Sequence, residues 1–112
     1  MKPARAVLLL STAGTRDEAE RLGEGLVEAG LAACCSVVPM IHSIYKWEGR
    51  LVREHEAMLL VKTSVERAEG AQAYLLEHHS SEVPEVLVLD IEGGAPAYLE
   101  WLVRETAAST DK

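Results

Sequence analysis

The sequence contains no phenylalanine and no asparagine, only two cysteines, and a small share of basic residues. Its 11 Lys and Arg residues are scattered singly among 18 Asp and Glu residues, which gives a net charge of -7. A nucleic-acid partner is therefore not expected, because binding to a phosphate backbone depends on clustered Lys and Arg. Cys34 and Cys35 are adjacent in the chain and do not make a disulfide framework.

Long apolar runs are also absent, and no segment approaches the length that spans a membrane. The first apolar run, Ala6–Leu10, is too short for the hydrophobic region of a secretory signal peptide. We therefore expect a cytoplasmic protein without a membrane partner. Because 48% of the 112 residues are apolar and 26% are charged, the chain is expected to fold as one domain, 1–112.

Apolar periodicity and turn residues predict four strands and three helices. The segment Thr15-Arg16-Asp17-Glu18 has the spacing of a capping box, so a helix is expected to begin there and to end at Gly30. Ser64 is expected to cap a second helix that ends near His78-His79, and Pro96 suits the first turn of a third. The expected strands are Ala6–Thr12, Ala33–Val38 with an extension over Met40–Trp47 beyond a break at Pro39, Glu56–Thr63 after a turn at Glu48-Gly49, and Glu85–Ile91.

This order is strand–helix–strand repeated twice and followed by a helix. It is typical of an α+β, ferredoxin-like βαββαβ sandwich with an additional C-terminal helix. Right-handed crossovers place both crossover helices on one face of the antiparallel sheet and leave the other face bare. Yet Val7–Leu10, Ala57–Val61 and Val86–Leu89 are apolar towards both faces. Leaving a Leu or Val exposed forfeits about 1.5–3 kcal/mol, so another copy of the chain is expected to cover the bare face.

Six short motifs occur in a fixed order between about residue 7 and residue 103. They are Ser11-Thr12-Ala13, Gly30-Leu31-Ala32-Ala33-Cys34, Ser43-Ile44-Tyr45-Lys46-Trp47-Glu48-Gly49, Leu60-Val61-Lys62-Thr63, His79 with Glu82-Val83-Pro84-Glu85, and Ala97-Tyr98-Leu99-Glu100-Trp101-Leu102. In this order the chain resembles the CutA family, the divalent-cation tolerance proteins. The resemblance implies a ferredoxin-like fold assembled as a homotrimer, a link to tolerance of copper and other divalent metals, and no established reaction.

His78 and His79 match the histidine pair proposed as metal ligands in that family, so the resemblance implies a weak site for copper(II) or another divalent cation. Imidazole suits copper, nickel and zinc, and Glu82 could add an oxygen. Ser11 stands where the family has a cysteine, and a hydroxyl is a poorer ligand for a soft metal. The alternative is electrostatic, because cationic histidines are favoured at a helix C-terminus. Adjacent helical side chains also point about 100° apart, which separates the two rings.

The aromatic residues suggest an interface. By resemblance, Tyr45 and Trp47 lie near the trimer contacts together with Lys62, and interface packing is also expected for Trp101. The alternative for these aromatic side chains is a ligand pocket.

Lys62 ends a buried strand and needs a partner, because an unpaired buried ammonium is costly. The candidates are Glu48, Glu56 and Glu100. Cys34 is expected in the core, and Cys35 is expected to face a neighbouring layer.

The sequence shows no phosphate-binding glycine loop, HExxH, CxxC or nucleophile elbow. An acylphosphatase-like hydrolase on the same fold is disfavoured, because that chemistry needs an asparagine. We therefore expect a trimeric, non-catalytic CutA-like protein that binds divalent cations weakly. The alternative is a PII-like signalling trimer that senses nucleotides or other small molecules, which rests on fold analogy alone.

Overall fold

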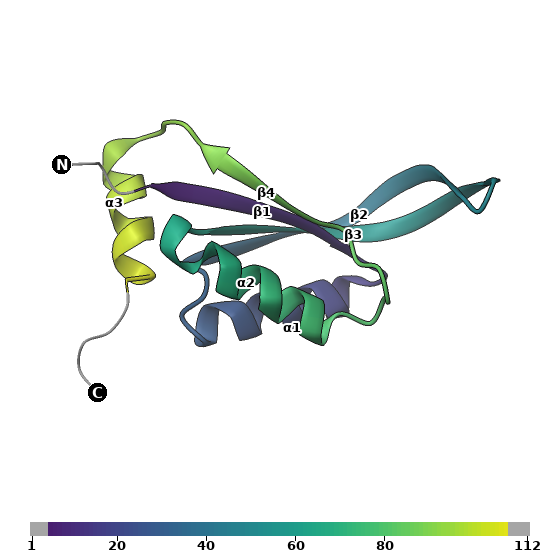
Figure 1. The fold of residues 1–112 in the computed structure, drawn as a ribbon, viewed down its shortest axis with the longest axis horizontal. Helices are drawn as coiled ribbons and strands as arrows, with labels where there is room; N and C mark the ends of the chain where they lie inside the picture. Colours follow the sequence, from purple (N-terminus) through teal and green to yellow (C-terminus); the bar gives the residue numbers. More distant parts are fainter. Residues whose placement is uncertain (1–4, 108–112) are drawn as a thin grey trace.

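The computed structural model describes residues 5–107, in which strands and helices alternate as a repeated βαβ unit followed by a helix (Figure 1). The elements are β1 (Ala6–Ala13), α1 (Arg16–Glu28), β2 (Cys34–Trp47), β3 (Arg50–Ser64), α2 (Val65–His78), β4 (Val86–Ile91) and α3 (Pro96–Glu105). In this part of the chain no helix has the length and apolar character needed to cross a membrane.

The four strands form one antiparallel sheet in the order β2-β3-β1-β4. β1 lies between β3 and β4, so that Leu9 pairs with Val61 on one side and with Val88 on the other. α1 and α2 cover one face of this sheet, and α3 lies at the end of the sheet where β1 begins (Figure 1). The predicted ferredoxin-like α+β fold with a C-terminal helix is thereby confirmed.

Local signals set the ends of α1 as predicted. Thr15 is the N-cap residue, and its hydroxyl accepts a hydrogen bond from the backbone N–H of Glu18 at 3.1 Å. At the other end Gly30 has a positive φ of 76°. The backbone N–H of Leu31 reaches back to the carbonyl of Leu26 at 2.9 Å, which is a Schellman-type closure. Ser64 occupies the N-cap position of α2, but its hydroxyl makes no capping hydrogen bond.

The β2–β3 hairpin differs from the prediction in two ways. β3 begins at Arg50 rather than at Glu56, because Glu48 and Gly49 have φ values of 52° and 81°. Positive φ at both central residues is the type I′ geometry that joins two strands through a two-residue turn. β2 is also one continuous strand across Pro39, where the register with β3 shifts between Val38 and Ile41. A bulge therefore accommodates the proline, which was wrongly predicted to break the strand.

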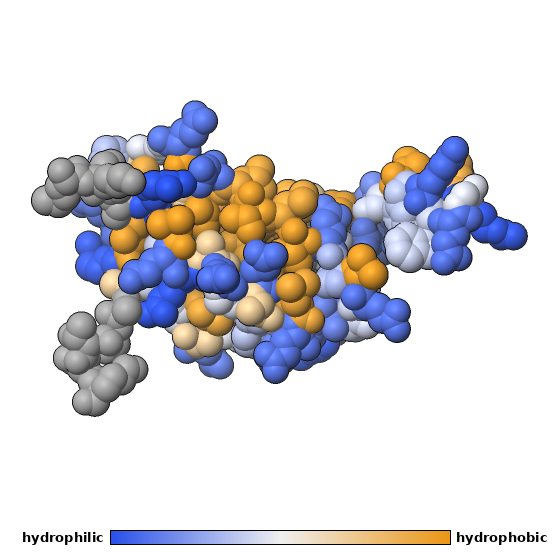
Figure 2. All heavy atoms as spheres, viewed as in Figure 1, coloured by the Kyte–Doolittle hydropathy of each residue, from blue (hydrophilic) through white to orange (hydrophobic). Residues whose placement is uncertain are grey.

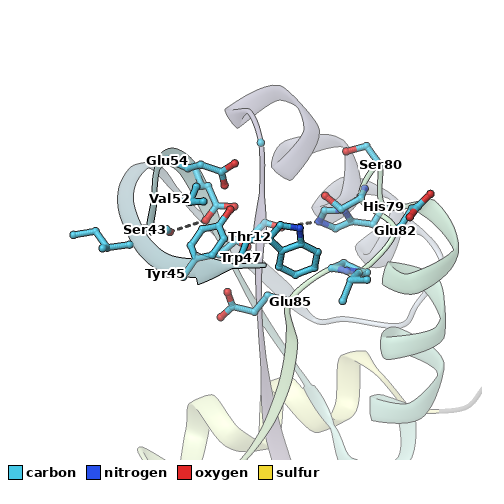
Figure 3. Close-up of a pocket in the computed structure, with 16 residues that line it drawn as sticks. Thr12, Ser43, Tyr45, Trp47, Val52, Glu54, His79, Ser80, Glu82 and Glu85 are labelled. Carbon is cyan, nitrogen blue, oxygen red and sulfur yellow. Dashed lines mark hydrogen bonds between the residues drawn. The ribbon is translucent and has the colours of Figure 1, made fainter. Parts of the chain in front are cut away.

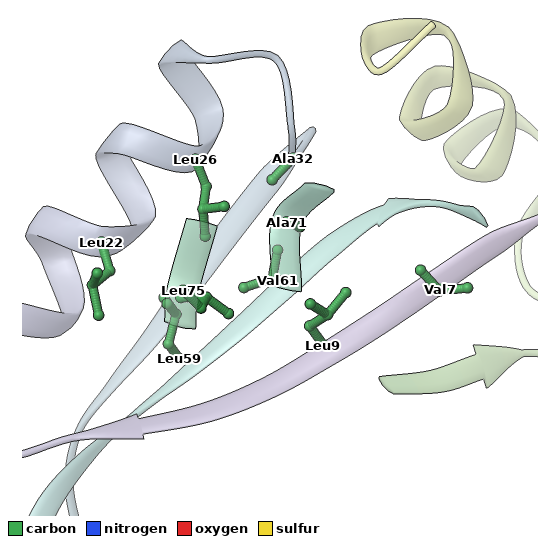
Figure 4. Close-up of a cluster of buried hydrophobic side chains, with 9 residues drawn as sticks. All are labelled: Val7, Leu9, Leu22, Leu26, Ala32, Leu59, Val61, Ala71 and Leu75. Atoms are coloured by element: carbon green, nitrogen blue, oxygen red, sulfur yellow. The ribbon is translucent and has the colours of Figure 1, made fainter. Parts of the chain in front are cut away.

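The hydrophobic core lies between the sheet and the helices α1 and α2 (Figure 4). Each of its side chains is at most 5% exposed. Its members are Val7, Leu9, Leu22, Leu26, Ala32, Leu59, Val61, Ala71 and Leu75. This core holds β1 and β3 rigidly and so fixes the position of the chain segments that leave their ends.

The opposite face of the sheet is apolar as well, and neither α1 nor α2 covers it. We call it the open face. Its apolar members include Leu8 and Leu10 on β1, which alternate with the core residues of the same strand. Leu87 and Leu89 on β4 pair with them and are 52% and 43% exposed. Figure 2 shows apolar residues gathered along the upper side of the body, where β4 and β1 run.

Candidate functional site

A cleft of about 910 Å³ lies between the hairpin, the end of β1 and the connection from α2 to β4 (Figure 3). Tyr45 and Trp47 line it from β2, and Thr12 lines it from β1. The connection, residues 79–85, forms its opposite wall. The core beneath β1 and the type I′ turn of the hairpin thus bring together segments that are far apart in the sequence.

The cleft is negatively charged. Four carboxylates line it, and no Lys or Arg is among the described residues that form its wall. Ser43 donates a hydrogen bond from its hydroxyl to Glu56 at 2.6 Å. A hydrogen bond with Glu54 raises the pKa of Tyr45, because the neighbouring carboxylate favours the protonated phenol. The remaining carboxylates are Glu82 and Glu85.

His79 is buried at the base of this cleft, and both of its ring nitrogens are engaged. Nε2 lies 2.6 Å from the carbonyl oxygen of Thr12, and Nδ1 lies 3.0 Å from the backbone nitrogen of Ser81. In the neutral ring Nε2–H therefore donates to Thr12 and Nδ1 accepts from Ser81. Its side chain is 3% exposed. His79 thus links the end of β1 to the start of the connecting segment.

Glu18 holds the same segment from α1. Its carboxylate accepts hydrogen bonds from the Ser80 backbone N–H at 2.9 Å and from the Ser80 hydroxyl at 3.0 Å. Burial alone would raise the pKa of Glu18, but these hydrogen bonds and the neighbouring His79 lower the pKa below its ordinary value. Glu18 was predicted to close a capping box, whereas its side chain binds Ser80.

Ser11 anchors the other end of the connection. Its hydroxyl donates to the carbonyl of Glu85 at 2.7 Å, and the residue is 1% exposed. The position that carries a cysteine in the resembled family is therefore a buried structural hydroxyl in this chain.

His78 has surroundings opposite to those of His79. It is exposed on the last turn of α2, and its ring stacks on Tyr74 with 4.1 Å between ring centres. Nδ1 lies 3.0 Å from the carbonyl of Tyr74, so Nδ1–H donates and Nε2 is left as an acceptor. The structure therefore does not bring the two rings to one point. Among residues 5–107, no group of three or more His, Cys, Asp or Glu side chains converges as a metal site.

The predicted interface residues lie at opposite ends of the sheet. Tyr45 and Trp47 stand on the hairpin and are 38% and 54% exposed. Lys62 lies on the open face near the other end, where its ammonium donates to the Ser36 hydroxyl at 2.5 Å. Trp101 is half-buried on α3.

Two predictions about the region around Lys62 were wrong. The Lys62 ammonium contacts the Ser36 hydroxyl and the Cys34 thiol, at 3.8 Å from the latter, rather than a carboxylate. The two cysteines also exchange their predicted roles, because Cys34 pairs with Lys62 on the open face while Cys35 packs against the core. Burial raises the pKa of Cys35 to about 12.

Comparison with known proteins places this architecture in a family. The family model described as CutA1 divalent ion tolerance protein matches residues 7–105. The chain belongs to this family. The CutA prediction made from the ordered motifs is therefore confirmed.

Individual CutA proteins are similar along most of the chain. A divalent-cation tolerance protein CutA from Pectobacterium atrosepticum is 38% identical over 97 residues, which cover 87% of this chain and 88% of that protein. A chloroplastic CutA from Arabidopsis thaliana is 35% identical over 105 residues, and the match covers 94% of this chain but only 58% of the relative. The structure of CutA from Synechococcus elongatus is 39% identical with a TM-score of 0.88, and the match covers 96% of this chain and 95% of that one.

Sequence reasoning missed part of what this CutA structure brings together. Glu54 was not assigned to the cleft, because the strand that carries it was predicted to start later. Sequence reasoning also did not pair His42 with His55, which are direct partners across the hairpin. Their equal spacing from the Glu48-Gly49 turn was a signal in the sequence that could have identified this pair.

Proposed function

We propose that this CutA family member is a trimeric, non-catalytic protein that binds copper(II) or another divalent cation weakly through His78 and His79. The observation that carries the proposal is the ring of His78. Its Nδ1 is satisfied by the Tyr74 carbonyl, and its Nε2 is available as a ligand. Neutral imidazole is a preferred ligand for copper, nickel and zinc.

The two histidines have unequal roles in this proposal. His78 binds the ion first, because ligation through Nε2 costs no protein hydrogen bond. His79 joins only when Nδ1 gives up the hydrogen bond from Ser81. That loss opposes binding and makes the site weak, since breaking one hydrogen bond in a buried network typically costs about 1–3 kcal/mol.

The open face supports the proposed homotrimer. Leu87 and Leu89 expose large apolar surface that a second copy would cover, at about 1.5–3 kcal/mol for each side chain fully buried. A closed ring of copies would also let the hairpin of one, with Tyr45 and Trp47, meet a neighbour near Lys62 and Trp101. Light scattering at micromolar concentration tests the assembly, and a folded 12.2 kDa particle would contradict it.

A cytoplasmic location is proposed as well, and both Cys34 and Cys35 being free thiols supports it. The comparisons give no support to the PII-like alternative.

Calorimetric titration of copper(II) tests the metal proposal. His78→Ala is expected to abolish most of the heat attributed to this site, and His79→Ala is expected to reduce it less. Gln72→Ala, on the same helix, serves as the control and should leave the heat unchanged. Identical heats of binding in the wild type and in all three variants would exclude His78 and His79 as ligands.

A further inference from the structure

The hairpin carries a second pair of histidines, outside the cleft. His42 on β2 and His55 on β3 are direct cross-strand partners, and both are exposed. Their ring centres are 4.4 Å apart, with 54° between the ring planes. We propose that His42 and His55 together form a binding site for a divalent transition-metal ion, with copper(II) as the preferred ion.

The pair lies on the face of the hairpin that points away from the cleft. Side chains alternate along a strand, and Ser43, Tyr45 and Trp47 line the cleft, although Ile44 between them also borders it. His42, at the intervening position, is therefore on the other face, and His55 shares that face because directly opposed residues of an antiparallel pair lie side by side. Neither His42 nor His55 is among the residues that line the cleft.

The ring nitrogens of this pair are free to bind. Within residues 5–107, the protein hydrogen bonds made by histidine rings belong to His78 and His79, and neither His42 nor His55 makes one. The pair therefore differs from His79, since ligation would break no existing contact. The β-ladder fixes both backbones in register, so only side-chain rotation is needed to direct the two nitrogens at one ion.

The separation of the rings suits one shared ion. With a metal–nitrogen bond of about 2.0–2.1 Å, the centre of an imidazole ring lies roughly 3.2 Å from the ion. Two rings bound at a right angle would then have centres about 4.5 Å apart, close to the observed 4.4 Å. Adjacent nitrogen ligands at a right angle are typical of tetragonal copper(II) and nickel(II) sites, and copper(II) binds most strongly in the first-row series.

The surroundings limit the affinity of this site. Arg53 pairs with Ile44 two positions along the same face, and Lys46 follows on β2. Both are cationic and repel a divalent ion. Water must complete the coordination, because the pair supplies two protein ligands. We therefore expect a weak surface site, in which the second imidazole contributes through effective concentration, by roughly a hundredfold over one imidazole alone.

The inference uses neither His78 nor His79, so it stands or falls independently of the proposed function. The experiment is copper(II) titration of the full chain by calorimetry, together with electron paramagnetic resonance at one equivalent of copper. The proteins are wild type, His42→Gln, His55→Gln, the His78→Gln/His79→Gln double variant as the matched control, and this control carrying His42→Gln or His55→Gln in addition. His42 and His55 are exposed on a hairpin outside the core, and circular dichroism verifies the fold of each variant.

We expect His42→Gln and His55→Gln each to weaken copper binding at this site by roughly a hundredfold, and by equal amounts. The spectrum should show two coordinated nitrogens in the control variant and one in the control background carrying either hairpin substitution. Two results would overturn the inference. One is unchanged affinity in both hairpin variants, and the other is loss in only one of them, which would indicate a single-histidine contact. The first of these results, combined with loss of copper binding in the control variant, would leave the proposed function intact.

Discussion

In this CutA protein, the two histidines that are adjacent in the sequence have separate surroundings, whereas the two that are distant in the sequence lie side by side. His78 and His79 are neighbours in the chain, yet one ring stacks on Tyr74 in solvent and the other is buried against Thr12. His42 and His55 lie on different strands, yet their rings are 4.4 Å apart. At the end of a helix, side chains that are adjacent in the sequence point in different directions. The pairing of two antiparallel strands instead places side by side residues that are distant in the sequence. Adjacent histidines at a helix terminus are therefore weaker evidence for a shared ion than histidines at equal distances from a tight turn.

The comparison also distinguishes imidazole rings that have a structural role from rings that are available to bind a ligand. His79 has no free nitrogen, because its two partners are backbone groups of Thr12 and Ser81. The hairpin pair has no such partners within the described chain. A buried ring whose two nitrogens are both hydrogen-bonded contributes to stability. An exposed ring without hydrogen bonds to the protein is available to bind a ligand. Substitutions at each kind of ring test this division between structural and available imidazoles.

The largest expected effect is the loss of stability in His79→Ala. This substitution leaves the Ser81 N–H and the Thr12 carbonyl without their partner, which is expected to cost about 2–4 kcal/mol in the free energy of unfolding. The matched variant His78→Ala should change that free energy by no more than about 0.5 kcal/mol, because the ring is exposed. Urea unfolding at one fixed protein concentration measures both. Equal losses in the two variants would contradict the division.

The fold could be predicted from the sequence because several local signals agree with one topology. Thr15 caps α1 and Gly30 ends it. Alternating core and open-face residues on β1 and β3 specify a sheet that is apolar on both sides. The length of the hairpin was not predictable from apolar patterning, because Arg50–His55 is mostly polar. That segment becomes a strand through pairing with β2 across the turn.

The site was predicted less well, for a physical reason. The position of His79 depends on hydrogen bonds to backbone groups, which every sequence possesses and no motif marks. The bond from Ser80 to Glu18 joins residues that are distant in the chain. The reversal of Cys34 and Cys35 follows from which of two adjacent strand positions faces the helices, a choice that the register with β3 determines.

A smaller effect is expected for the pH dependence of Glu18, which holds the segment that positions His79. Its pKa is lowered in the folded protein from an ordinary value of 4.5. The stability it contributes is therefore fully present above pH 4.5 and is lost as the pH falls through the lower, folded-state pKa. Glu18→Gln should cost about 1–2 kcal/mol near neutral pH, and the difference from wild type should shrink on acidification.

This difference is measured from the unfolding midpoints of wild type and Glu18→Gln between neutral and strongly acidic pH. Glu24→Gln, an exposed position on the same helix, is the control and should run parallel to wild type. A difference between Glu18→Gln and wild type that grows on acidification would mean that burial, rather than hydrogen bonding from Ser80, dominates at Glu18. The rigid placement of His79 would then need another cause.

The smallest expected effect sharpens the hairpin side of the comparison. Arg53 lies on the same face as His55 and two positions away, about 7 Å along the strand. At that distance in salt solution, its charge should oppose a divalent ion by roughly 0.5 kcal/mol, or about twofold in affinity. Arg53→Gln should therefore strengthen copper binding about twofold at physiological salt, with a larger gain at low salt and a smaller one as more salt is added. Arg50→Gln, whose residue pairs with Trp47 on the cleft face, should have a smaller effect. Equal gains from both substitutions would show that net charge, rather than the face of the hairpin, governs binding.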